Sequence, residues 1–162
     1  TNCSAQDPEM ANRISLHQQR RPKNWQTTET YLVVSDVIEQ AQVSAHLLDC
    51  ATMLSTNYFF DLMKERFGED FTIIDEEILK LTQKEKAAIE ADILNEWQKI
   101  LTAARNSQTD LVVVTNEVGL GIVPENAFSR WFRDVLGHVN QSLGKEADAV
   151  FFVIAGIPTK IK

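Results

Sequence analysis

The chain has 162 residues, of which 44% are hydrophobic and 24% charged, and these values are typical of one soluble globular domain over residues 1–162. Its formal net charge of −7 argues against broad binding to nucleic acid, because the sequence offers no basic face to a phosphate backbone. The apolar runs are far shorter than the roughly 20 residues of a membrane helix, and neither a signal peptide nor a CxxC pair is found, so we expect a cytoplasmic protein with reduced thiols.

Apolar residues at helical spacing alternate along the chain with short apolar runs typical of buried strands. The sequence predicts, in chain order, a helix over 8–19 capped by Asp7, a helix over 29–42, a strand at 46–48, a helix over 58–67 ending at Gly68, a helix over 84–105, a strand at 111–114, a helix over 126–143 and a strand at 150–154. Residues 69–82 are expected to form an insertion or a surface excursion.

The predicted strands are near-continuous apolar runs, which is typical of strands covered on both faces of a parallel sheet. Strands that alternate with helices of this length favour an α/β domain with a mostly parallel sheet. In such a sheet the ligand site lies at the carboxyl ends of the strands. Polar residues follow the strands there, with Asp49 after the first strand and Thr115, Asn116 and Glu117 after the second. This edge of the sheet is therefore a candidate site.

A histidine and two arginines stand together at the end of the first predicted helix, as His17, Arg20 and Arg21. Neutral imidazole is a competent nucleophile toward phosphorus, and guanidinium groups can neutralise the charge of a phosphate. The same residues also suit a solvated helix terminus, where His and Arg interact favourably with the negative end of the helix dipole. The local pattern leaves both interpretations open.

Two further features also leave alternatives open. Asp49 can hold Mg²⁺, or a water bound to it, in a nucleotide-binding α/β protein, and it can equally cap the following segment. The loop after the second predicted strand contains Gly119 and Gly121. These glycines suit a loop close to a ligand, or a tight turn that needs glycine for its backbone angles. Their spacing does not make a GxGxxG motif.

Segments spread over nearly the whole chain, from Asp7 to Lys162, resemble those of one family. The most specific is VTNEVGLGIVPEN at 114–126, which is too long for chance to be a good explanation. The others are a histidine segment over 9–25, LLDC at 47–50 with Thr52, a stretch over 129–141, and AGIP at 155–158 with Lys160 and Lys162. On these motifs the chain is identified as a member of the bifunctional adenosylcobinamide kinase / adenosylcobinamide-phosphate guanylyltransferase family of cobalamin synthesis.

The resemblance implies a P-loop NTPase-like fold, with a mostly parallel sheet and helices on both faces, and two reactions. In the first, GTP or ATP phosphorylates the aminopropanol hydroxyl of adenosylcobinamide. In the second, GMP moves from GTP onto that phosphate through a GMP-histidine intermediate, giving adenosylcobinamide-GDP and pyrophosphate. We expect Mg²⁺ to accompany the nucleotide, with Asp49 or Glu117 as the candidate ligands. The family is typically homotrimeric.

The resemblance also assigns site residues to positions of this chain. His17 falls on the histidine that carries GMP and is the expected catalytic residue. Glu29 and Asp49 fall on acidic nucleotide contacts. The remaining nucleotide contacts fall on a stretch that follows the second strand of the family and on the turn after the histidine, and comprise Thr1, Asn2, Cys3, Gln18, Gln19, Arg20 and Arg21.

One part of the family pattern has no counterpart in the sequence. The family begins with a strand, a glycine-rich loop ending in Ser-Gly-Lys-Ser, a helix and a second strand, and these do not precede Thr1. Such a start takes roughly 30 residues, and we expect it in the full-length protein. Without it the cradle for the β- and γ-phosphates would be missing, and the chain would be a catalytically inactive nucleotide-binding or assembly module. A simple kinase without guanylyl transfer is a weaker alternative. Phosphoryl transfer needs no histidine nucleophile, so the presence of His17 in its motif argues against a kinase alone.

Overall fold

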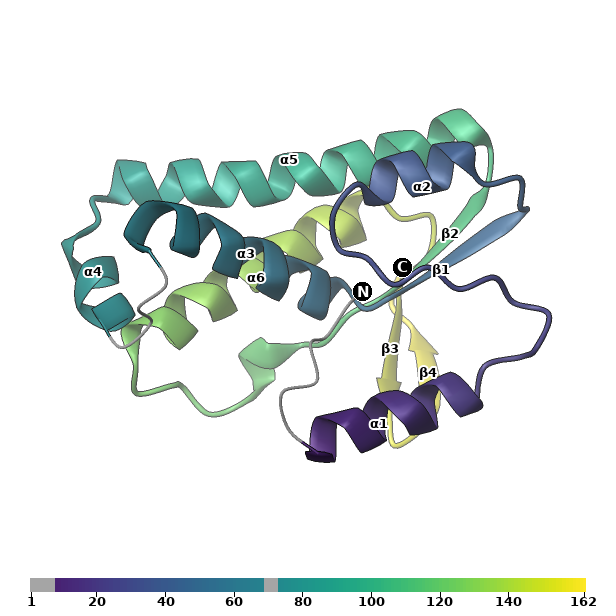
Figure 1. Ribbon diagram of the computed structural model, residues 1–162, viewed down its shortest axis with the longest axis horizontal. Coiled ribbons are helices and arrows are strands. Elements are labelled where there is room, and N and C mark those ends of the chain that lie inside the picture. Colours follow the sequence, from purple (N-terminus) through teal and green to yellow (C-terminus); the bar gives the residue numbers. More distant parts are fainter. Residues whose placement is uncertain (1–7, 69–72) are drawn as a thin grey trace.

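The computed structural model describes residues 8–68 and 73–162, except for the side chains of Pro8, Met10, Arg13 and His17. Helices and strands alternate through much of this part of the chain, as expected for an α/β protein (Figure 1). In chain order the elements are α1 (Pro8–Gln19), α2 (Val34–Gln40), β1 (Ala45–Asp49), α3 (Ala51–Phe67), α4 (Ile74–Lys80), α5 (Gln83–Ser107), β2 (Asp110–Val114), the 3₁₀ helix η2 (Val118–Leu120), α6 (Ala127–Glu146), β3 (Phe151–Ile154) and β4 (Ile157–Lys160).

The first two strands form a parallel pair, which confirms the predicted parallel pairing. Their register runs from Ala45 opposite Asp110 to Asp49 opposite Val114. The crossover between them contains α3, α4 and α5, and a parallel pair requires a long connection of this kind. Because the strands run in the same direction, Asp49 and Val114 end side by side at one edge.

The prediction of a strand at 150–154 is confirmed, but its expected place in the parallel sheet is wrong in the part of the chain that the structure describes. β3 turns back into β4, and the two pair antiparallel as a separate sheet. Ala155 and Gly156 connect them with φ of 51° and 78°, as in the type I′ turn of a two-residue hairpin. The sequence pattern misses β4 because Pro158 cannot donate to a ladder and argues against a strand.

The helices gather around one hydrophobic core, in which α3, α5 and α6 pack on one another and α2 packs on α5 (Figure 1). The Trp97 side chain of α5 is fully buried, and its indole Nε1 donates a hydrogen bond to Ser55 Oγ on α3 at 3.0 Å. Phe59 of α3 is equally buried and contacts the rings of Phe128, Trp131 and Phe132 at 4.9–5.7 Å between ring centroids. This core supports the carboxyl edge of β1 and β2.

Several predicted helix bounds differ from the structure. α2 begins at Val34 and not at 29, after Val33 in a left-handed conformation with φ 51°. α3 begins at Ala51 and not at 58, because its first turns mix small and polar residues that hide the apolar period. The surface excursion expected over 69–82 is partly wrong, since α4 lies there and buries Ile78 completely against the core.

The prediction that the strands are covered on both faces is also wrong for the described residues. One face of the parallel pair, which includes Leu48 and Val113, packs on the core. On the other face Leu47 and Val112, which are register partners, remain 48% and 55% exposed. β3 is likewise open, with Phe151 and Val153 more than half exposed. The helices among the described residues therefore cover a single face of β1 and β2.

Candidate functional site

The carboxyl edge of the parallel pair is held together by hydrogen bonds between the segments that follow the two strands. Asn116, just after β2, donates from its backbone nitrogen and from Nδ2 to Thr52 Oγ1 at 3.2 and 2.9 Å. Thr52 lies in the first turn of α3, directly after β1. The two bonds therefore fix the end of β2 against the end of β1, at the edge where open α/β sheets bind ligands.

A third segment reaches this edge from α6. Asn140 Nδ2 donates to the Asn116 backbone oxygen at 3.1 Å and to Glu117 Oε1 at 3.0 Å. Its Oδ1 accepts a hydrogen bond from Thr115 Oγ1 at 2.7 Å. We call Thr52, Thr115, Asn116, Glu117 and Asn140 the strand-edge cluster. It contains the three polar residues that the sequence places after β2.

Asp49 ends β1 at the same edge, with an exposed side chain. One of the two interpretations of Asp49 was that it caps the following segment. The N-cap residue of α3 is Cys50, whose side chain makes no cap hydrogen bond, so Asp49 does not occupy the N-cap position of that helix. Its carboxylate and that of Glu117 supply the oxygen donors that Mg²⁺ prefers.

The structure describes no group of three or more His, Cys, Asp or Glu side chains that could hold a metal ion within residues 8–68 and 73–162. Magnesium in nucleotide sites commonly takes one or two protein carboxylates and completes its shell with phosphate oxygens and water. Asp49 and Glu117 fit this donor set, because each is an exposed carboxylate at the strand edge.

The turn after α1 brings together three of the residues assigned to nucleotide contact. Gln18 Nε2 donates to Glu29 Oε1 at 2.8 Å, and Arg21 Nη1 forms an ion pair with the same oxygen at 3.6 Å. Gln18 is the neighbour of His17 in the last turn of α1. We call residues 17–21 with Glu29 the His17 turn.

The other assigned residues lie elsewhere. Gln19 is directed back along α1, where its Nε2 donates to Ser15 Oγ at 3.1 Å, and Arg20 is exposed just after the helix. The positions of Thr1, Asn2 and Cys3, like the proposed cap Asp7, are outside the described residues. Figure 1 draws α1 on the side of the strands away from α2 and α5, and none of the α1 residues whose side chains the structure describes belongs to the core.

The backbone angles of the loop over 118–124 test one of the two interpretations of Gly119 and Gly121. A tight turn that needs glycine for its backbone angles is wrong for this loop, since the glycines with positive φ in the described chain are Gly68 and Gly156. A side chain at Gly121 would instead meet the Val118 backbone oxygen at 3.3 Å. Ile122 is 95% exposed and Leu120 is also open, so the loop presents apolar side chains beyond the strand edge.

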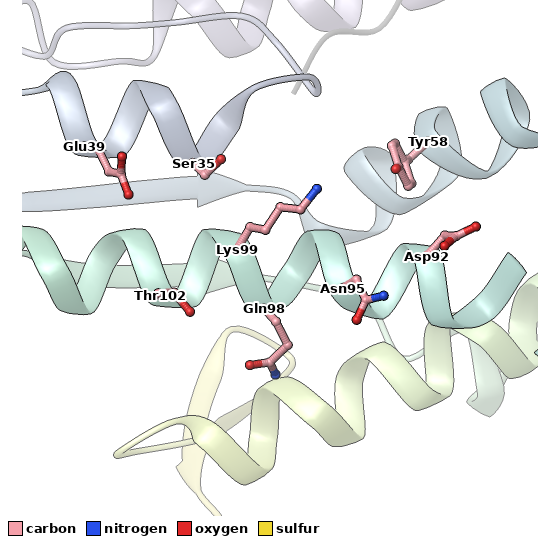
Figure 2. Close-up of a pocket in the computed structure, with 8 residues that line it drawn as sticks. All are labelled: Ser35, Glu39, Tyr58, Asp92, Asn95, Gln98, Lys99 and Thr102. Atoms are coloured by element: carbon pink, nitrogen blue, oxygen red, sulfur yellow. The ribbon is translucent and has the colours of Figure 1, made fainter. Parts of the chain in front are cut away.

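A hollow of about 640 Å³ lies among α2, α3 and α5 (Figure 2). One of the residues that line it is Lys99, which pairs at 3.0 Å with Glu96, and this hydrogen bond raises the pKa of Lys99. Burial and the nearby Glu96 carboxylate raise the pKa of the Tyr58 phenol in the same wall. The lining comprises Ser35, Glu39, Tyr58, Asp92, Asn95, Gln98, Lys99 and Thr102, none of which the sequence pattern or the family resemblance nominates.

Neither Thr52 nor Asn140 is assigned a site role from the sequence, although both fall in segments that carry the family resemblance. A signal for Asn140 exists in the sequence, because Asn is a poor helix former and stands here inside a strong amphipathic helix, next to the buried Val139. Separately, none of the described helices combines the length and the apolar character needed to cross a membrane.

The fold defines an α/β protein whose parallel strands end at a polar edge, which is the place where open α/β sheets bind ligands. Comparison with known proteins narrows this class, since the family described as cobinamide kinase / cobinamide phosphate guanyltransferase matches residues 1–161. The chain is 40% identical over 158 residues to the bifunctional adenosylcobalamin biosynthesis protein CobU of Salmonella typhimurium, covering 96% of this chain and 80% of that protein. It is 37% identical to the CobU protein of Escherichia coli, with the same coverage, and 28% identical over 162 residues to the CobP protein of Pseudomonas aeruginosa, covering 99% of this chain and 79% of that protein.

The chain therefore belongs to the cobinamide kinase / cobinamide phosphate guanyltransferase family. This confirms the family, the activity and the enzyme class expected from the motifs. The protein is a kinase and guanylyltransferase of cobalamin synthesis, and its α/β architecture with a parallel strand pair agrees with that expectation.

Proposed function

We propose that His17 carries GMP between GTP and the cobinamide phosphate in this enzyme. Residues 1–162 would form one nucleotide-binding domain of P-loop type, in a cytoplasmic homotrimer that uses GTP or ATP for the kinase step. The observation that supports this assignment is the pair of contacts that Glu29 makes, a hydrogen bond from Gln18 and an ion pair with Arg21, which order the residues just after the histidine. A turn with this arrangement suits a site that has to hold a charged phosphate in one orientation.

The transfer takes place in two displacements. A nitrogen of the neutral His17 imidazole attacks the α-phosphorus of GTP, a P–N bond forms, and the P–O bond to the leaving pyrophosphate breaks. An oxygen of the cobinamide phosphate then attacks the same phosphorus, and the P–N bond breaks to return free histidine and give adenosylcobinamide-GDP. Covalent catalysis of this kind divides one difficult transfer into two easier steps.

The charged residues have separate roles in this scheme. Arg20 and Arg21 offset the negative charge that develops on the transferring phosphoryl group, while Glu29 keeps Arg21 and Gln18 in place. Thr1, Asn2, Cys3 and Gln19 complete the nucleotide contacts. Asp49 and Glu117 would hold Mg²⁺, which supplies positive charge next to the phosphates when it is bound.

Labelling with GTP that carries a radioactive α-phosphate tests the role of His17. The full-length wild-type protein is expected to retain the label in an acid-labile, alkali-stable bond, whereas His17→Ala retains none. His138→Ala is the matched control, because His138 lies on α6 and pairs with Glu90 at 2.5 Å, so this variant should label like the wild type. Equal labelling of wild type and His17→Ala would rule out the histidine route. Nucleotide binding by a wild-type protein that takes no label would instead support the alternative of an inactive nucleotide-binding module.

A further inference from the structure

The amide of Asn140 joins three consecutive residues at the end of β2. Its oxygen accepts from Thr115, and its nitrogen donates to the Asn116 backbone oxygen and to the Glu117 carboxylate. The chemistry of the partners fixes the orientation of this amide, because a backbone carbonyl and a carboxylate can only accept hydrogen bonds. Both N–H groups of Asn140 are therefore directed at the segment after β2.

Asn140 lies on a helix, α6, that the hydrophobic core holds in place. Its helix, α6, begins with Asn126 as N-cap, whose Oδ1 accepts from the Ser129 backbone nitrogen at 2.7 Å. The preceding residue, Val139, is completely buried, as are Val135 and Leu136 one turn earlier. The position of Asn140 is thus fixed by the core, whereas the residues it holds, Asn116 and Glu117, are exposed.

The hydrogen bonds of Asn140 contribute more to orientation than to the packing of the fold. The apolar face of α6 is complete without Asn140, and an Asn inside a helix is intrinsically unfavourable. The group it orients is a carboxylate at the edge where the ligand of an open α/β sheet lies, close to the end of β1 at Asp49. A carboxylate at such an edge needs a fixed direction if it is to meet a nucleotide and its cation, and groups that orient such ligands commonly affect activity.

We propose that Asn140 is a positioning residue for nucleotide transfer, which holds the Glu117 carboxylate and the backbone after β2 in the orientation that serves the phosphates of the nucleotide. This inference rests on the proposed function, because it takes the strand edge as the place where the nucleotide binds. Asn140 acts through Glu117 and does not itself touch the substrate.

Replacement of Asn140 by Asp separates positioning from folding. The new carboxylate can still accept from Thr115, but it cannot donate to Asn116 or Glu117 and places a like charge beside Glu117. The full-length Asn140→Asp protein should therefore lose about 10–100-fold in the rate of α-labelled GMP transfer to the protein. The midpoint of thermal unfolding should stay close to that of Gln141→Asp, a control that adds the same charge at the next, exposed position of α6.

The separation of kcat from KM gives a result that a purely structural role would not. A Glu117 carboxylate that points in the wrong direction weakens an interaction made in the transfer step, and such a change lowers kcat while leaving KM unchanged. The Asn140→Asp protein should therefore have a lower kcat for labelling than Gln141→Asp, with a similar KM for GTP. Asn140→Leu, which can never donate, should show the same loss of kcat.

Three results would overturn the proposal: a kcat for Asn140→Asp equal to that of Gln141→Asp, an undiminished kcat in Asn140→Leu, or a loss of rate matched by unfolding. A wild-type protein that takes no label would contradict the proposed function and not this inference. Hydrogen exchange of the backbone amides at 116 and 117 without nucleotide then decides whether Asn140 holds the turn. Faster exchange in Asn140→Leu than in Gln141→Leu supports the inference, and equal exchange overturns it.

Discussion

The strand-edge cluster and the His17 turn differ in what holds them in place. Two members of the strand-edge cluster, Thr52 and Asn140, lie on α3 and α6, whose other faces are buried in the core with Phe59 and Trp131. The His17 turn is held by polar contacts to Glu29, and Trp25 nearby is half exposed. Burial of apolar side chains fixes the geometry around the strand-edge cluster and also stabilises the fold strongly. Exposed polar contacts fix the geometry of the His17 turn but add little stability.

Truncation of one tryptophan in the core and one beside the His17 turn should show the largest contrast between these regions. Trp97→Ala removes a fully buried side chain and its hydrogen bond to Ser55, so the free energy of unfolding should fall by about 3–5 kcal/mol. Trp25→Ala removes a side chain that is 51% exposed and should cost less than about 1 kcal/mol. Urea unfolding of both full-length variants measures the difference. Similar losses would show that the His17 turn is packed more tightly than its exposure indicates.

Loss of the α6 cap should have an intermediate effect. Asn126→Ala removes the acceptor for the Ser129 backbone nitrogen, and such a change costs about 1 kcal/mol. Urea unfolding of the full-length variant should detect this loss of stability. Asn126→Asp retains the acceptor and should remain near wild type. A full loss in Asn126→Asp would mean that the cap hydrogen bond is not the cause.

The loss of stability that His46 on β1 causes at low pH should be smaller than the effects of these substitutions. Burial lowers the pKa of His46 on β1, and its Nε2 has no hydrogen-bond partner among the described residues. A histidine whose pKa is lowered by folding binds protons more readily when unfolded, so stability falls as the pH drops below the ordinary value of about 6.5. His46→Phe should lose less stability than wild type between about pH 7.5 and 5.5 in urea titrations. His138→Gln is the control and should lose as much stability as wild type over this pH range. If His138→Gln loses less stability and His46→Phe does not, the assignment to His46 is wrong.

Loss of the Glu29 carboxylate should have the smallest effect on stability. The ion pair with Arg21 is largely exposed, and such pairs contribute roughly 0–1 kcal/mol. Glu29→Gln should therefore unfold almost like wild type while its labelling with α-labelled GTP falls several-fold, because Gln18 and Arg21 lose a charged common acceptor. Glu39→Gln on α2 removes an equal charge elsewhere and should leave labelling intact. Equal labelling in both variants would show that Glu29 does not order the turn.

Local pattern predicts the core region well and the His17 turn poorly. The period of Ile89, Ile93, Trp97 and Ile100 identifies α5, and Asn126 after Pro124 identifies the start of α6, because buried faces and caps leave a mark in neighbouring residues. The bounds of α2 and the existence of α4 and β4 were missed, since tertiary contacts and a two-residue turn decide them.

The candidate site shows the same limit. The strand ends at Asp49 and at 115–117 predict the polar edge, but the sequence does not show that Asn140, on a distant helix, orients it. The meeting of Gln18 and Arg21 at Glu29 is also a contact across an irregular segment, which no period encodes. The role of His17 came from the family resemblance and remains a prediction.

The long crossover between β1 and β2 also determines when this sheet can form. The β3–β4 hairpin needs only the two residues at 155 and 156 to close, and hairpins form within about 1–10 μs. Leu47 and Leu48 instead pair with Val112 and Val113, so the partner that β1 has among the described strands is not present until the whole of α3 to α5 has been synthesised and folded back. Non-local parallel pairing of this kind is slow. Among the described strands, β1 is therefore the one that waits longest for its partner to be synthesised.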